Sequence, residues 1–335
     1  MFDVYSSILK FSEKLNSEVL INNNPIFRAA QTENRWFNEQ NIKTALNNWV
    51  ETLRNKESKN WFTDNYRLLE NPKRIGIVCA GNIPLVGFHD VLSVLLSGHL
   101  AVVKLSSQDT VLMTKVLDWL CDCFPNWKDN LEIVEKLGNV DALIATGSDN
   151  TARYFEYYFA KIPRLIRKNR TSIAVLNGEE TDEQIVGLGE DIFTYFGLGC
   201  RNISKLFVPD GYDFVKLLSI WERNFSYLPM HTKYFNNYEY RKSIYIINNI
   251  NHFDDGCVLL LEDKNIFSHI ATLHYEFYQN LNQVQDIINS QQEQIQVIST
   301  MLPGFSNSCT LGQTQKPKIN EYADGVDTIA FLMDL

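Results

Sequence analysis

Short apolar segments that alternate with stretches of helical periodicity constrain this fold more than any other feature of the sequence. Each segment has the length of one buried strand, and most of the intervening residues repeat their apolar positions at helical spacing. Strands separated by helices form parallel β-α-β units, so the pattern predicts an α/β fold with a doubly wound parallel sheet. The four predicted strands are IGIVCA at 75–80, AVVKL at 101–105, DALIAT at 141–146 and SIAVL at 172–176.

Helical segments surround these strands, and a second α/β section follows from residue 177. Residues 1–70 are mainly amphipathic at helical spacing, and Asp109 is a candidate cap for the helix predicted up to residue 124. The other helices are expected at 89–98, 151–160, 181–197 and near 280–290. In the second section the predicted strands are 204–209, 243–248, 257–262 and 269–277.

Charge and hydropathy argue against two classes of partner. The chain carries 31 basic and 40 acidic side chains, a net charge of −9, whereas nonspecific nucleic-acid binding needs a basic face. The local basic patch RLIRKNR at 164–170 could still bind a phosphate group. No run approaches the roughly 18 apolar residues of a membrane helix. The N-terminus does not resemble a signal peptide, so we expect a cytoplasmic protein.

Cys200 stands out among six cysteines. The six include no pair of C-x-x-C motifs, which argues against a structural zinc site, and no metal is expected. Gly197 and Gly199 precede Cys200 in a helix-to-strand turn, where glycine leaves the thiol uncrowded. Arg201 beside it favours the reactive thiolate. The alternative interpretation is a small buried cysteine that follows a helix end.

Asn82 is the second candidate. It lies in the loop GNIPLVG that follows the first predicted strand, and ligands bind at such carboxyl ends in open α/β sheets. Its neutral amide is a donor suited to an oxyanion, although an Asn in this loop can equally be a turn residue. The charges of Glu190 and Asp191 are expected on the solvated face of their helix, and His89 in a solvated or capping position.

Together these motifs resemble the aldehyde dehydrogenase superfamily, and in particular its acyl-CoA reductase branch. GIVCAGNIPL resembles the superfamily's strand and Asn-Pro loop, and SGHLAVVKLSSQDT resembles its Lys-containing strand. ATGSDNTAR resembles its Thr-Gly-Ser motif, and GLGCRNISKLFVP resembles its nucleophile segment. The ending at 312–332 is similar to that of the acyl-CoA reductases. The resemblance implies an aldehyde dehydrogenase-like fold with a cofactor domain and an α/β catalytic domain.

The resemblance also implies a role for each matching residue. Cys200 is the expected nucleophile, and Asn82 with the backbone N–H of Cys200 is the expected oxyanion hole. Lys104 is expected to bind the adenosine ribose of a nicotinamide cofactor, and a helix start after the third strand to favour its pyrophosphate. The other expected cofactor-binding positions are Gly81, Ser106, Ser107, Thr146, Gly147 and Ser148.

The same resemblance divides the chain into three parts. Residues 1–176 are expected to hold the N-terminal helices and the cofactor domain, and residues 177–311 the catalytic domain. The segment 312–335 is expected to return to the cofactor domain or to lie at an oligomer interface. Its apolar residues (Val326, Ile329, Phe331 and Leu332) suggest a terminal strand that pairs across the subunits of a homodimer or larger oligomer.

One departure from the superfamily bears on the reaction. Hydrolytic members carry a water-activating Glu in the stretch equivalent to 164–175, where this chain has no carboxylate. We therefore expect reduction of an acyl-CoA to an aldehyde through an acyl-Cys200 intermediate, with release of CoA. NADPH is the expected cofactor, and NADH remains possible, because Ser107 stands where many NAD-preferring members have Glu. The alternatives are another acyl-phosphate or semialdehyde dehydrogenase of the superfamily, and a catalytically silent oligomeric binding protein.

Overall fold

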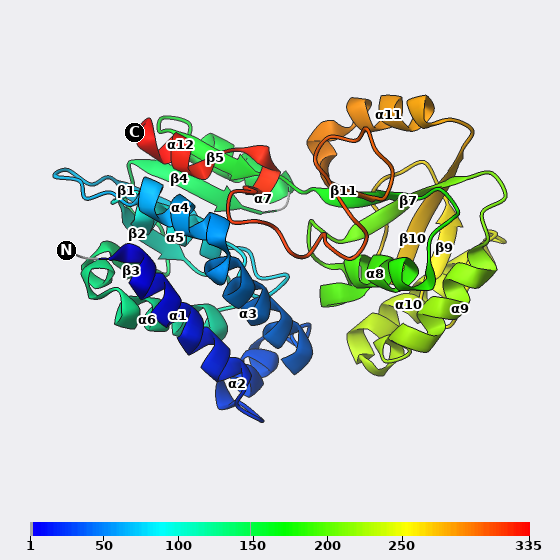
Figure 1. The fold of residues 1–335 in the computed structure, drawn as a ribbon, viewed down its shortest axis with the longest axis horizontal. Helices are drawn as coiled ribbons and strands as arrows, with labels where there is room; N and C mark the ends of the chain where they lie inside the picture. Colours follow the sequence, from blue (N-terminus) through cyan, green and yellow to red (C-terminus); the bar gives the residue numbers. More distant parts are fainter. Residues whose placement is uncertain (1–2, 148) are drawn as a thin grey trace. The chain divides into compact units, whose positions relative to one another are not determined.

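A computed structural model describes residues 3–147 and 149–335, and Ser148 therefore lies outside the described residues. The chain forms two compact units, which are coloured along the sequence in Figure 1. Unit 1 contains the chain up to Asn169 together with Pro317–Leu335, and unit 2 contains Arg170–Lys316. The first unit thus ends before the expected boundary at residue 176, because the strand that follows Asn169 belongs to the second sheet.

Unit 1 is built on a five-stranded sheet in the order β3-β2-β1-β4-β5, in which every pairing is parallel. The parallel α/β arrangement predicted from the sequence is confirmed, and three of its strands are the predicted ones. The structure adds β3 and β5, which the sequence pattern did not reveal. The strands are β1 (Arg74–Val78), β2 (Leu100–Lys104), β3 (Leu131–Ile133), β4 (Ala142–Thr146) and β5 (Arg164–Arg167).

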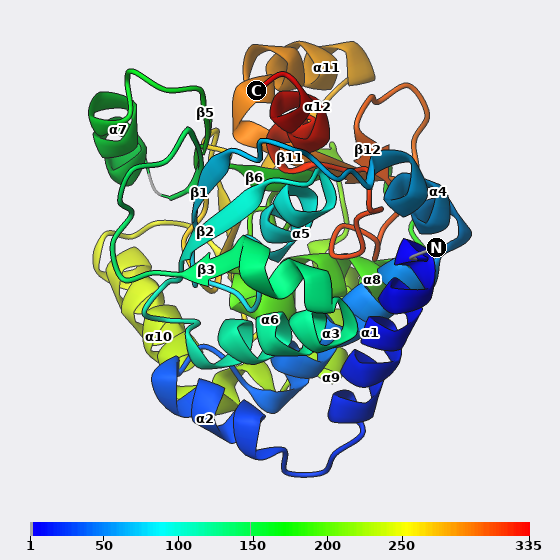
Figure 2. The same ribbon diagram turned by 90° about the vertical axis from the view of Figure 1, so that its left-hand side faces the viewer.

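Helices cover both faces of this sheet. Side chains of alternate residues along β1 point to opposite faces of the sheet. Ile75 and Ile77 pack in the cluster that includes α5 and α6, whereas Val78 packs in a cluster with Phe155 of α7. Figure 2 shows α5 and α6 against this sheet. The helices of unit 1 are α1 (Val4–Val19), α2 (Pro25–Glu33), α3 (Glu39–Arg54), α4 (Lys56–Asn65), α5 (Phe88–Leu96), α6 (Val111–Cys123), α7 (Asp149–Tyr158) and α12 (Thr328–Met333), with 3-10 turns η1 (Pro125–Asn130) and η5 (Ala323–Gly325).

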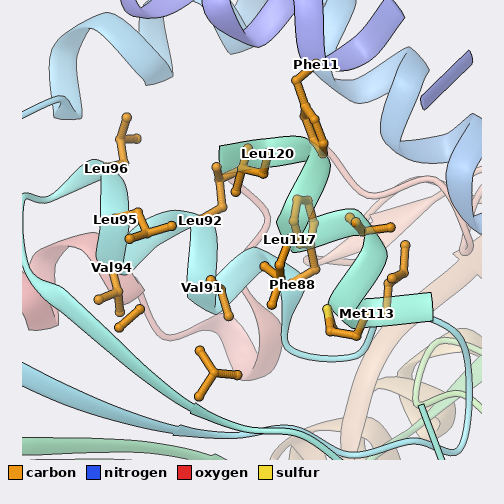
Figure 3. Packing of buried hydrophobic residues seen from close by; sticks show 14 of the residues in the cluster. Phe11, Phe88, Val91, Leu92, Val94, Leu95, Leu96, Met113, Leu117 and Leu120 are labelled. Atoms are coloured by element: carbon orange, nitrogen blue, oxygen red, sulfur yellow. The ribbon is translucent and has the colours of Figure 1, made fainter. Parts of the chain in front are cut away.

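The main core of unit 1 lies where α1 meets α5 and α6. Phe88 and Leu92 of α5 lie against Leu117 and Leu120 of α6, with Phe11 of α1 beside them, and all five are fully buried or nearly so (Figure 3). Removing each such side chain from water stabilises the fold by about 1.5–3 kcal/mol. The predicted helical character of the N-terminal 70 residues is confirmed, because these helices close the core over the sheet.

The C-terminal segment forms a helix and not the expected strand. Asp327 caps α12 by accepting the Ala330 amide, and Ile329 and Leu332 are buried at helical spacing. His99 Nε2 lies 3.0 Å from the Leu332 carbonyl oxygen, so the segment is held within unit 1. The prediction of a terminal strand is wrong. The homo-oligomer inferred from that strand loses this support and stays a prediction.

Unit 2 is built on a seven-stranded sheet in the order β12-β11-β6-β7-β10-β9-β8. Its pairings are parallel except for the short β8/β9 pair. The segment at 172–176 becomes β6 of this sheet, between β11 and β7, and is not the fourth strand of the cofactor sheet. The strands are β6 (Thr171–Val175), β7 (Ile203–Pro209), β8 (Phe253–Asp254), β9 (Leu259–Glu262), β10 (Thr272–Tyr278), β11 (Ile295–Thr300) and β12 (Ser308–Cys309).

Helices also cover both faces of the second sheet, with α11 on one face and α8, α9 and α10 on the other (Figure 1). The predicted strand at 243–248 is wrong, because this segment completes α10. Tyr234 and Tyr238 of α10 are buried and donate their hydroxyls to Cys257 and Asp254, and this packing overrides the local β propensity. The helices are α8 (Asp182–Phe193), α9 (Phe214–Phe225), α10 (Thr232–Ile247) and α11 (Leu281–Ser290), with η2 (Thr194–Gly197), η3 (Leu228–Met230) and η4 (Gln292–Gln294).

Within the described residues, no helix is both long enough and apolar enough to span a bilayer.

Candidate functional site

Cys200 lies on an exposed turn that joins α8 to β7 in unit 2. The turn contains three consecutive residues with left-handed backbone. These are Tyr195, Phe196 and Gly197, with φ of 55°, 57° and 77°. Aromatic residues rarely adopt this conformation, which persists only where the surroundings hold it in place. Here both rings are buried, and Phe196 stacks on His231 at 4.1 Å between ring centroids. The packing of these two rings thus holds the turn in one defined conformation.

Asn202 connects this turn to the end of α8. Its Oδ1 accepts the Gly199 N–H at 2.8 Å, and the side chain is buried. Because the last carbonyls of a helix lack partners inside the helix, a side-chain donor at this end stabilises it. The Nδ2 group of Asn202 donates to the carbonyls of Asp191, Ile192 and Thr194.

The backbone and the neighbour of Cys200 are held as well. Ser172 on β6 donates its hydroxyl to the Cys200 carbonyl at 3.0 Å, and Arg201 donates Nη1 to the Thr314 carbonyl at 3.2 Å. Arg201, the cationic residue that follows Cys200 in the chain, is thus held by the backbone of Thr314. The turn therefore combines an exposed sulfur, an immobilised backbone and an adjacent cation, which are the features of a reactive cysteine.

The other cysteines differ from Cys200. Among the six cysteines, all within the described part of the chain, Cys200 alone is exposed. Burial raises the pKa of the Cys79 and Cys257 thiols to about 12 and that of Cys121 to about 11, and it also raises the pKa of Cys123. Thiols with such pKa values stay protonated near neutral pH and are poor nucleophiles.

The predicted cofactor residues of unit 1 gather at one edge of its sheet. In the parallel register Val78 pairs with both Lys104 and Ala145, so the loops after β1, β2 and β4 leave the sheet side by side. Gly81 packs against the loop after β2, where a Cβ on Gly81 would lie 2.5 Å from Ser106 Oγ. Only glycine permits this close approach of the two loops.

This edge is accessible to a ligand. The side chains of Asn82 and Ser107 are exposed, and Lys104, Ser106, Thr146 and Gly147 are half-buried. The three hydroxyls and the ammonium group suit a nucleotide, and this edge is where open α/β sheets bind nucleotides. No cluster of three His, Cys, Asp or Glu residues that could hold a metal occurs among the described residues. Cys200 belongs to unit 2, so the structure places the candidate residues in two separately folded halves.

Arg167 of the basic patch is part of the fold rather than of an exposed phosphate site. Its side chain is buried, and Nη2 donates to Asp90 Oδ1 at 2.5 Å and to Thr328 Oγ1 at 2.9 Å. Its Nη1 donates to the Ala323 carbonyl at 2.6 Å. Removing one partner of such a buried ion pair leaves the other charge buried without compensation, which destabilises the folded state. Arg167 therefore anchors the C-terminal segment within unit 1.

His89 also differs from its expected solvated or capping position. It is half-buried beside the rings of Trp49 and Trp61, and its Nε2 lies 2.8 Å from the Ile319 carbonyl oxygen. Its role is thus to bind the C-terminal segment.

Asp109 neither caps α6 as its N-cap residue nor faces solvent. It is buried, and its Oδ2 accepts the Leu85 amide at 2.7 Å in the loop that carries Asn82. Thr110 occupies the N-cap position of α6, and Glu33 accepts the N–H groups of Thr110 and Val111. Burial raises the pKa of Asp109 to about 8, although the hydrogen bond from Leu85 lowers it. In the folded protein near pH 7 the side chain of Asp109 is therefore mainly the neutral acid.

Asp109→Asn is expected to stabilise the protein at alkaline pH by an amount on the order of 1–3 kcal/mol. The unfolded chain releases the Asp109 proton near the ordinary pKa of Asp, whereas the folded protein retains it up to about pH 8. Stability therefore falls as pH rises through this interval, and an asparagine, which keeps the acceptor for Leu85, removes that loss. Urea unfolding at about pH 5 and about pH 9 measures it. The idea fails if wild type and variant lose the same stability between the two pH values.

Asp191 contradicts the sequence expectation most clearly, because it is buried and not on a solvated helix face. A signal for this was present in the sequence. Ile185, Leu188 and Ile192 form the buried stripe of α8, and position 191 continues that stripe at helical spacing. A charge on an apolar stripe indicates a buried polar contact, which the structure contains.

One protein-family model matches more than half of the chain. The sequence model of the family described as acyl-CoA reductase (LuxC) matches residues 10–219. No curated protein sequence matches the chain.

Solved structures of aldehyde dehydrogenases share the fold. Aldehyde dehydrogenase 21 from Physcomitrella patens, in complex with succinate, is 12% identical with a TM-score of 0.72, over 98% of this chain and 83% of that one. The NADP-dependent glyceraldehyde-3-phosphate dehydrogenase of Bacillus halodurans is 12% identical with a TM-score of 0.62, over 88% and 73%. An NAD-dependent aldehyde dehydrogenase from Sinorhizobium meliloti is 10% identical with a TM-score of 0.62, over 92% and 71%. At these identities the likeness establishes the aldehyde dehydrogenase fold.

Proposed function

The chain belongs to the acyl-CoA reductase (LuxC) family, an aldehyde-forming class of enzyme, and on that premise we propose that it reduces an acyl-CoA thioester through a covalent intermediate on Cys200. The observation that carries the proposal is the Cys200 turn. It presents an exposed thiol beside Arg201, whereas Cys79, Cys121 and Cys257 have pKa values of about 11–12. A nucleophilic thiolate is the group that such a reaction requires.

The proposed chemistry begins with the Cys200 sulfur. Its thiolate attacks the thioester carbonyl, a new C–S bond forms, and CoA departs as a thiolate that needs little acid assistance. A reduced nicotinamide nucleotide, when bound, supplies a hydride to the acyl carbon. Asn82 donates its side-chain N–H to the oxyanion that results on the thiohemiacetal. Collapse of that oxyanion breaks the C–S bond, releases the aldehyde and returns the electron pair to Cys200.

The absence of a carboxylate from 164–175 favours reduction over hydrolysis. Residues Arg164–Arg167 form β5 and Thr171–Val175 form β6, and the side chains of both strands are neutral or basic. A water molecule near the acyl-enzyme therefore has no general base from this stretch. The acyl group is then left for hydride transfer or for return to a thiol.

An absorbance assay tests the proposed function. The protein is incubated with NADPH and a panel of acyl-CoA chain lengths, and loss of the reduced-nicotinamide absorbance is followed with aldehyde trapping. Mass spectrometry of the protein incubated with acyl-CoA alone is expected to show an acyl group on Cys200. An adduct with an acyl phosphate but none with any acyl-CoA would favour the second candidate, an acyl-phosphate reductase. No adduct and no turnover with either would indicate a silent binding protein.

NADPH is expected to be the preferred cofactor, and Ser107→Glu is expected to shift the preference toward NADH. The exposed Ser107 hydroxyl can donate to a 2′-phosphate, and Lys104 offers a charge-assisted contact of about 1.5–3 kcal/mol, or about ten- to a hundredfold in affinity. A glutamate at this position repels the phosphate and accepts from the ribose hydroxyls. The measurement is kcat/KM for each cofactor at one acyl-CoA concentration.

Ser107→Asn is the matched control, because it enlarges the side chain without adding charge. It is expected to keep the preference for NADPH. Equal use of both cofactors by the wild type, or an unchanged ratio in Ser107→Glu, would show that Ser107 does not govern the choice.

A further inference from the structure

The carboxylate of Asp191 is buried near the C-terminal end of α8, with 1% of the residue exposed. It accepts four hydrogen bonds, two on each oxygen. Oδ1 accepts from the amide and the hydroxyl of Thr314, both at 2.9 Å. Oδ2 accepts from the Ser299 hydroxyl on β11 and from the Gly312 amide, both at 2.8 Å. A charge in such surroundings is costly unless its acceptors are filled, and here each oxygen has two donors.

These bonds hold the segment 311–315, LGQTQ, directly against α8. Gly312 has φ of +85°, and its Cα lies 3.2 Å from where a Cβ on Gly187 of α8 would stand. The two backbones therefore lie in close contact with no side chain between them, and a Cβ at position 187 would crowd Gly312. The segment therefore packs closely against α8, and the Asp191 carboxylate accepts the hydrogen bonds that hold it there.

Both neighbours of Cys200 connect to this arrangement. Arg201, which follows Cys200, donates to the carbonyl of Thr314, the residue that Asp191 holds most firmly. Gly199, which precedes Cys200, donates to Asn202, whose Nδ2 donates in turn to the Asp191 carbonyl at 3.1 Å. The residue before Cys200 is thus connected to Asp191 through Asn202, and the residue after it is connected through Thr314.

We propose that Asp191 is a positioning residue for the Cys200 turn: its carboxylate locks segment 311–315 onto α8, and Thr314 thereby holds Arg201 in place beside the nucleophile. The inference rests on the proposed function only in taking Cys200 as the reacting group. Asp191 does not touch Cys200, so its effect is on how the thiol is presented and on the charge beside it.

The experiment compares substitutions around Asp191 by two readouts on the full-length chain. The first is the rate at which iodoacetamide alkylates Cys200 at about pH 7, resolved from the other cysteines by peptide mass mapping. The second is kcat and KM for acyl-CoA reduction. Asp191→Asn and Thr314→Val are expected to slow alkylation by about tenfold, the size of one pH unit in thiolate fraction, and to lower kcat with little change in KM.

Two controls separate positioning from a general loss of packing. Thr314→Ser keeps the hydroxyl that donates to Asp191, and it is expected to alkylate close to the wild-type rate. Ser299→Ala also removes one hydrogen bond to Asp191, but on the β11 side, so segment 311–315 stays attached. It is therefore expected to alkylate within about twofold of wild type while its unfolding midpoint falls by a few degrees.

The outcomes decide the proposal in every case. Unchanged alkylation in folded Asp191→Asn and Thr314→Val overturns it, as does an equal slowing in Ser299→Ala. If Asp191→Asn fails to fold, the Thr314→Val and Thr314→Ser pair decides alone, since each changes only a methyl or hydroxyl group. Alkylation needs neither acyl-CoA nor cofactor. A wild-type protein that shows the expected alkylation pattern but reduces no acyl-CoA would therefore refute the proposed function and retain the positioning role.

Discussion

Cys200→Ala is expected to abolish aldehyde formation while leaving the fold intact. The substitution removes only the sulfur, and the proposed reaction has no path without the C–S bond it forms. The side chain is exposed, so its loss creates no cavity, and the unfolding midpoint is expected to change by less than about 2 °C. The measurement is acyl-CoA-dependent oxidation of NADPH together with thermal unfolding of the same samples.

Cys309→Ala is the matched control, because it removes a second thiol of unit 2 from β12. It is expected to keep most of the activity. Turnover above a few per cent of wild type in Cys200→Ala would place the nucleophile elsewhere. An unfolded Cys200→Ala protein would contradict the description of Cys200 as a residue that the turn presents but does not need.

Asn82→Ala is expected to lower kcat by about 10²-fold, because one oxyanion donor contributes roughly 3–4 kcal/mol to the transition state. The side chain is exposed at the carboxyl end of β1, on a loop that Asp109 holds through the Leu85 amide. Its removal leaves that support and the contact of Gly81 with the loop after β2 in place. Steady-state kinetics with acyl-CoA and a separate titration of NADPH binding measure the two effects.

Asn82→Asp sharpens this test, because it keeps the shape of the side chain while replacing the donor by a charged acceptor. We expect a loss at least as large as in Asn82→Ala. A decrease confined to KM in either variant would mean that Asn82 binds the ground-state substrate and would falsify the oxyanion role.

The sequence alone predicts those elements whose identity depends on local periodicity. Three strands of unit 1 and helices α5, α6 and α8 follow from their apolar residues, because the pattern that indicates each element lies within one short segment of the chain. The pattern at 172–176 correctly predicts a strand, but the strand lies in the second sheet and not in the first. Its partner β11 begins more than a hundred residues later, and no local pattern specifies a partner at that distance.

Two segments show how tertiary packing decides the type of element. Residues 243–248 include three isoleucines and one tyrosine, yet they complete α10 because Tyr234, Tyr238 and Tyr245 are buried along that helix. The last residues form α12 because Asp327 caps it and Ile329 and Leu332 pack within unit 1. In both segments the local propensity is weak compared with the free energy of burying a helical face.

The candidate residues divide in the same way. Cys200 after two glycines and Asn82 after a buried strand are local patterns, so the sequence by itself determined which residues to test. Its resemblance to a known family gave the class of reaction to expect. The burial of Asp109 and Arg167 was decided only by the tertiary structure. The same holds for the partners of Asp191, although its place on the apolar stripe of α8 is visible in the sequence. The partners of Asp191 lie 108 to 123 residues further along the chain, and those of Arg167 lie 77 to 161 residues away. Which groups surround a buried charge depends on what the fold brings against it, and spacing along the chain does not contain that information.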